Sequence, residues 1–79
     1  MSDEIADLIR LWNRLLPNVP LPSVVQFELW RSMHSPNTLR AAIIETSKKS
    51  LRLERDMDLD FAVRFTSKVA NTRQREAAL

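Results

Sequence analysis

Apolar side chains recur at helical spacing along residues 3–16, and this is the clearest pattern in the chain. They stand at i, i+3, i+4, i+7, i+10 and i+11, beginning at Ile5 and ending at Leu16. At about 100° per residue these positions share one face, and charged side chains such as Arg10 lie opposite. Ser2 precedes the pattern as a suitable N-cap. The segment is therefore predicted to be an amphipathic helix.

Prolines and capping residues divide the rest of the chain. Three of the six residues in 17–22 are proline, which predicts a stiff, extended connector. Ser35 followed by Pro36 predicts that one helix stops and another begins, because serine caps and proline suits the first helical position. Asp58 is a suitable cap for a last helix. The predicted helices are 3–16, 23–34, 36–50 and 58–75.

These elements predict an all-α protein, a compact bundle of four short helices in one domain covering residues 1–79. We expect the last few residues to fray, because no breaker follows the final helix. At 79 residues the chain is close to the lower limit for folding on one core. The inward positions of the helical patterns predict a core of Trp12, Leu16, Val25, Leu29, Ile43, Phe65 and Val69.

The segment 23–34 is apolar on more than one side. Val25 and Leu29 form one stripe, while Phe27 and Trp30 fall elsewhere on the same helix. One interpretation is an exposed patch that binds a protein partner or a second copy of the chain, since soluble monomers seldom expose such surfaces. The other is a central helix covered on several sides. The predicted interaction residues are Phe27, Trp30, Ile44 and Leu51.

The composition argues against an enzyme. There is no glycine for a phosphate-cradling loop and no cysteine for a thiolate nucleophile or zinc site. His34 is the single histidine, and no second metal ligand stands at a suitable spacing. We expect it to have a local capping or surface role. The predicted protein is non-enzymatic, with no catalytic residues, no metal and no cofactor.

Charge is distributed unevenly along the chain. The net charge is −2 over residues 1–30 and +4 over residues 31–79. On the last predicted helix, four side chains at i, i+4, i+7 and i+11 cluster on one side. A row of this kind could contact nucleic-acid phosphates, although most such rows are ordinary solvent-exposed faces of a helix. The residues of this alternative nucleic-acid site are Arg64, Lys68, Asn71 and Arg75.

The sequence thus predicts a small helical protein-interaction module that self-associates through an apolar patch, with nucleic-acid binding as the alternative. No apolar run approaches the roughly 18 residues of a membrane span, and the N-terminal residues are acidic, unlike a secretory signal. We therefore expect a cytoplasmic protein that has no membrane partner.

Overall fold

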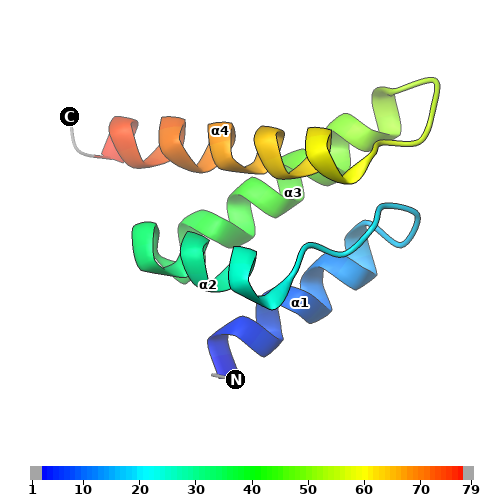
Figure 1. Ribbon diagram of the computed structural model, residues 1–79. Coiled ribbons are helices and arrows are strands. Elements are labelled where there is room, and N and C mark those ends of the chain that lie inside the picture. The colour runs from blue at the N-terminus through cyan, green and yellow to red at the C-terminus, as the bar shows by residue number, and fades with distance from the viewer. Residues whose placement is uncertain (1–2, 78–79) are drawn as a thin grey trace.

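The computed structural model describes residues 3–77, which form four helices (Figure 1). They are α1 (Asp3–Leu15), α2 (Val24–Met33), α3 (Pro36–Arg52) and α4 (Leu59–Ala77). The protein is all-α, as the sequence predicts, and each predicted helix boundary is confirmed to within two residues. The proposed cap Ser2 and the last two residues, where fraying was expected, lie outside the described residues.

Three helices begin at the residues that the sequence predicts as caps. Ser23, Ser35 and Asp58 each accept a hydrogen bond from the backbone N–H three residues later, at 3.1, 3.2 and 2.7 Å respectively. Each bond satisfies one of the N–H groups that a helix start leaves without an intrahelical partner. The starts of α2, α3 and α4 are therefore encoded locally.

The helices end without glycine. The caps after α2 and α3 are His34 and Leu53, and both have extended backbone geometry. No residue within 3–77 has a positive φ. Because the chain leaves these helices through extended rather than left-handed conformations, the usual glycine at a helix end is not needed.

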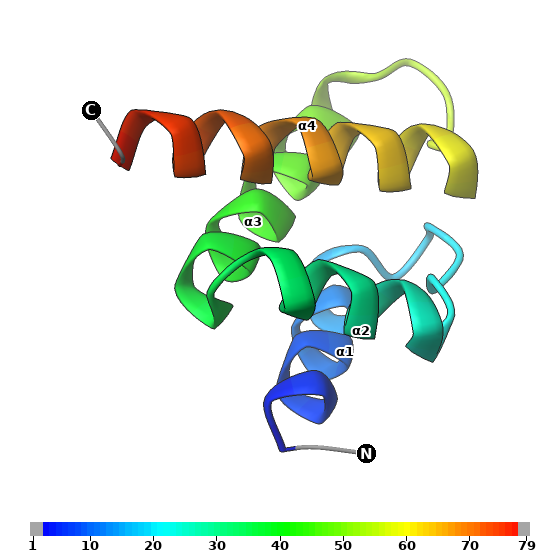
Figure 2. The ribbon, with the colours of Figure 1, turned by 60° about the vertical axis from the view of Figure 1, so that its left-hand side comes forward.

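The third helix is the centre of the arrangement. It packs against all three other helices, most extensively against α4. Figures 1 and 2 show α1 and α4 at opposite sides of the molecule, with α2 and α3 between them. In both views α2 runs in the same direction as α4, so the C-terminal end of α2 lies beside the second half of α4. Within the described residues, no helix is both long and apolar enough to traverse a bilayer.

Three aromatic rings form the core where α1 meets α2. Trp12, Phe27 and Trp30 are all buried, and their ring centroids lie 5.4 to 6.2 Å apart. Phe27 meets both indoles edge to face, and the two indoles stack on each other. Such geometries add to the stabilisation that burial alone provides.

The contact between α3 and α4 is built from small side chains instead. Ala42 and Thr46 on α3, and Ala62, Thr66 and Ala70 on α4, are all fully buried. The three α4 positions are spaced at i, i+4 and i+8 and therefore share one face. Small side chains at these positions allow the two helix backbones to approach closely.

The predicted core is partly wrong. Trp12, Leu16 and Ile43 are buried as expected, and two further members, Phe65 and Val69, are half-buried. Val25 and Leu29, by contrast, are 72% and 53% exposed. The ten-residue helix α2 turns its aromatic side toward the core, because two large rings bury more apolar area there than the aliphatic stripe would.

Candidate functional site

The predicted apolar patch does not exist as one surface. Phe27 and Trp30 belong to the aromatic core, so the prediction that they form an exposed binding site is wrong. Ile44 and Leu51 are exposed on α3, the latter by 86%. The interpretation of α2 as a covered helix is correct for its aromatic side only.

A different apolar surface lies on the outer side of α2. Val25, Leu29 and Met33 are spaced at i, i+4 and i+8 and are 72%, 53% and 51% exposed. We call these three residues the α2 face. Leu21 and Val24, at the N-terminal end of the helix, are also exposed. The spacing identifies this stripe in the sequence, but the sequence prediction placed it on the inside.

Polar side chains border the α2 face. On the helix, Glu28 and Ser32 lie along one edge and Gln26 along the other. The Ser32 hydroxyl donates a hydrogen bond to the Leu29 carbonyl at 2.6 Å, so it is satisfied within its own helix. An apolar centre with a polar rim is the usual composition of a protein interface.

The predicted basic stripe is present on α4. Arg64, Lys68, Asn71 and Arg75 are exposed, and all four line one shallow groove along the helix. Arg64 lies 3.2 Å from the Asp60 carboxylate, whereas Lys68 and Arg75 form no ion pair within residues 3–77. The structure therefore brings the four predicted residues together on one surface.

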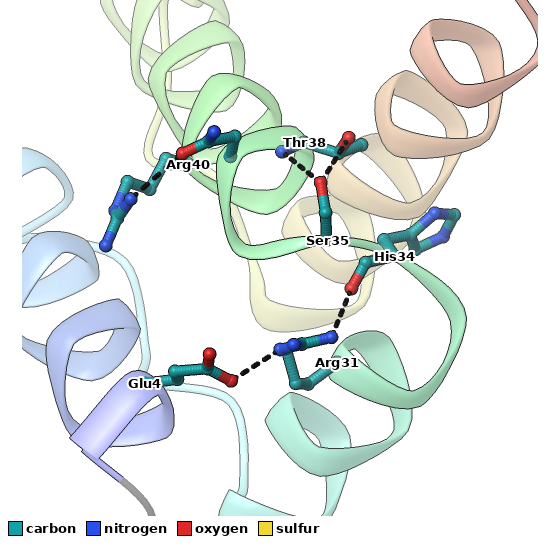
Figure 3. A network of polar contacts seen from close by, with 7 residues as sticks. Glu4, Arg31, His34, Ser35, Thr38 and Arg40 are labelled. Atoms are coloured by element: carbon teal, nitrogen blue, oxygen red, sulfur yellow. Dashed lines mark hydrogen bonds and ion pairs between the residues drawn. The ribbon is translucent and has the colours of Figure 1, made fainter. Parts of the chain in front are cut away.

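His34 is buried, which the sequence did not predict. Only 6% of this residue is exposed, and its backbone N–H closes α2 by donating to the Trp30 carbonyl at 2.8 Å. Its own carbonyl accepts from Arg31 at 3.2 Å, and Arg31 also pairs with Glu4 on α1 at 2.7 Å. Figure 3 shows the two contacts of Arg31, with the imidazole of His34 turned away from Arg31 and toward α4.

The imidazole reaches a hollow between α2 and α4. This hollow of about 560 Å³ is lined by Met33, His34, Asn71, Gln74 and Arg75. The buried Nδ1 atom of His34 has no hydrogen-bond partner within the described residues. Buried polar atoms are normally satisfied, so this atom is an exception, and because it is closed to solvent it does not itself open onto the hollow. No local sequence signal shows this site, because it depends on how α2 and α4 pack.

Within residues 3–77, no group of three or more histidine, cysteine or acidic side chains is placed to hold a metal ion. Comparison of the chain with protein-family models, with curated proteins and with solved structures finds no match. The α2 face and the basic stripe of α4 are the two candidate functional surfaces of the described residues.

Proposed function

We propose that this protein is a non-enzymatic interaction module that self-associates through the α2 face. The observation that carries the proposal is the exposure of Val25, Leu29 and Met33 in one row on a helix whose other side is the core. The row extends over nine residues, from Val25 to Met33, or about 12 Å of helix. Exposed apolar side chains gathered in one row are of the kind that marks interaction sites on soluble proteins.

A second copy of the chain suits this face because the row is symmetric about Leu29. In an antiparallel pair of α2 helices related by a two-fold axis, Leu29 packs on its counterpart and Val25 packs on Met33 of the second copy. None of the three side chains is charged, so no like charges face each other along the row. Pairing also adds apolar burial to a chain whose own core is small.

The size of the face sets the expected strength. Stable dimers bury about 1,200 Å² or more in total, and contacts limited to one short helix from each copy fall near or below that value. We therefore expect a weak, reversible dimer whose population rises over the micromolar to millimolar concentration range.

Sedimentation equilibrium over that concentration range tests the proposal. The wild-type protein is expected to show a mass that rises with concentration, and Leu29→Lys is expected to remain a monomer because it places a charge at the centre of the contact. Circular dichroism at low concentration should show an unchanged fold, since Leu29 is half exposed.

Leu51→Lys is the matched control, because Leu51 is a more exposed leucine on another helix. It is expected to leave the association unchanged. A wild-type protein that stays monomeric at millimolar concentration, or equal effects of the two substitutions, would contradict the proposal.

A further inference from the structure

Three adjoining hollows run from the exposed side of α4, whose residues alone line the first, to the C-terminal end of α2, and we call them together the α2–α4 seam. The first is lined by the α4 groove residues Arg64, Lys68, Asn71 and Arg75 among others. The second shares Asn71 and Arg75 with the first and adds His34. The third shares His34 with the second and continues to Arg31. Shared lining residues make the three hollows one continuous surface.

The charge of this surface has one sign. Each of the three hollows is lined by at least one arginine, and none by an aspartate or glutamate among the described residues. A further hollow on the other flank of α4 shares Lys68 and Thr72 with the first, and it is lined by Glu45 and Glu76. Arg64 and Arg31 are paired with Asp60 and Glu4. Lys68 and Arg75 remain as cations with no ion pair within residues 3–77, and their charge favours an anionic ligand.

His34 lies where two of these hollows meet. It is more than nine-tenths buried, it lines two of the three hollows, and its Nδ1 atom has no partner within residues 3–77. Asn71 and Gln74 line the same central hollow as Arg75 and offer amide groups. Two amides and a guanidinium can together offer an anion several hydrogen-bond donors.

We propose that the α2–α4 seam binds the phosphate groups of a nucleic-acid strand, with Arg75 at one end, Arg64 at the other and Lys68 between them. Arg64 and Arg75 are eleven residues apart, which is about 16 Å of helix, a distance longer than one phosphate and suited to several in succession. Arg64 is available because its pair with Asp60 is largely exposed and therefore weak.

Fluorescence anisotropy with a labelled single-stranded 20-mer at low salt, and with its duplex, measures this binding. If Arg64, Lys68 and Arg75 each contact a phosphate, log K is expected to fall linearly with log salt concentration, with a slope of about −2 for a single strand. Arg75→Gln is expected to weaken binding about tenfold and to reduce that slope, because a charge-assisted contact is lost.

Arg73→Gln is the matched control. It removes the same charge from the same helix, but Arg73 faces Glu45 of α3 at 3.6 Å, away from the seam. Its binding should stay within about twofold of wild type, well below the tenfold effect of one lost contact. Equal effects of the two substitutions, or no binding of either oligonucleotide, would overturn the proposal. Arg64→Gln should also weaken binding but leave self-association unchanged, because the hollow that Arg64 lines contains no residue of the α2 face, so this proposal and the dimer proposal fail separately.

The single histidine permits a direct test of the site in the unaltered protein. Its imidazole NMR signals are unambiguous and are expected to shift as the 20-mer is added. Binding of the 20-mer without any shift of the imidazole signals would show that the strand does not lie beside His34. A titration with inorganic phosphate, at the same concentration of phosphate groups as in the 20-mer, shows whether the protein recognises a strand or phosphate alone. Equal shifts and equal affinity for both would show a free phosphate compound as the ligand and overturn the strand proposal.

Discussion

The two halves of this molecule are held together by opposite kinds of side chain. Where α1 meets α2, three large aromatic rings fill the core. Where α3 meets α4, alanines and threonines allow the backbones to approach. The aromatic half is stabilised mainly by the apolar area it removes from water, whereas the small-residue half depends on close fit and on satisfied hydroxyl groups.

The two halves also differ in whether their buried polar atoms are hydrogen-bonded. The indole N–H of Trp12 is buried with no acceptor among the described residues, yet the ring stays in the core because of the area it buries. Thr46 and Thr66 lie at the centre of the small-residue half, and their hydroxyls are hydrogen-bonded to each other at 2.7 Å. Trp30 connects the halves by donating to Ser67 on α4 at 2.9 Å.

The largest effect is expected from removing a ring of the aromatic half. Phe27 is fully buried and touches both indoles, so Phe27→Ala should lower the free energy of unfolding by about 3–5 kcal/mol. Urea unfolding followed by circular dichroism at low protein concentration measures the loss. Val25→Ala, on the exposed side of the same helix, should change the stability by less than about 0.5 kcal/mol. Similar losses of stability for Phe27→Ala and Val25→Ala would contradict the structure, in which Phe27 is on the buried side of α2 and Val25 on the exposed side.

Sequence reasoning succeeded where the signal is local. The periodicity from Ile5 to Leu16 predicts α1 and its buried side, and Ser35 with Pro36 predicts a boundary that the structure confirms. It failed for α2, because apolar side chains occupy both sides of that helix. Which side faces inward depends on the neighbouring helices, and no local pattern contains that information.

A smaller effect is expected from overfilling the small-residue half. Ala70→Leu adds a large side chain to a fully buried position on α4, which should cost about 1–3 kcal/mol through displaced neighbours. Thermal unfolding measures the change. Ala41→Leu on α3 is the control, since Ala41 is only partly buried and the added side chain can extend into solvent. If Ala70→Leu stabilises the protein, the α3–α4 contact has unfilled space and is not closely packed.

The small-residue half could be predicted in part, because helical spacing places Ala42 and Thr46 on the inner side of α3 and Ala62 and Thr66 on the inner side of α4, and all four are buried. The larger Phe65 and Val69, which the same spacing also places inward, are only half-buried. The placement of the basic-stripe side chains on one side of α4 could be predicted, because it depends only on helical spacing. The burial of His34 could not, because it arises where the end of α2 meets α4.

The finest test of the comparison concerns the two buried threonines. Thr46 donates its one hydroxyl proton to the Ala42 carbonyl at 2.8 Å, so the 2.7 Å contact between the hydroxyls must have Thr66 as donor and Thr46 as acceptor. Thr46→Val therefore leaves the Thr66 donor without its partner and should cost about 1–2 kcal/mol. Thr66→Val leaves the Thr46 donor satisfied and should cost less, about 0.5–1 kcal/mol.

Urea unfolding of both single variants and of the double variant measures which substitution costs more stability and whether the two losses are additive. Because both losses involve the same bond, the double variant should lose less than the two single losses combined. The reverse order would mean that Thr46 donates to Thr66, and additive losses would mean that the hydroxyls act independently. With the predicted order, stability in the small-residue half depends on which donor keeps a partner. In the aromatic half it depends on buried area, even where the Trp12 N–H has no acceptor within residues 3–77.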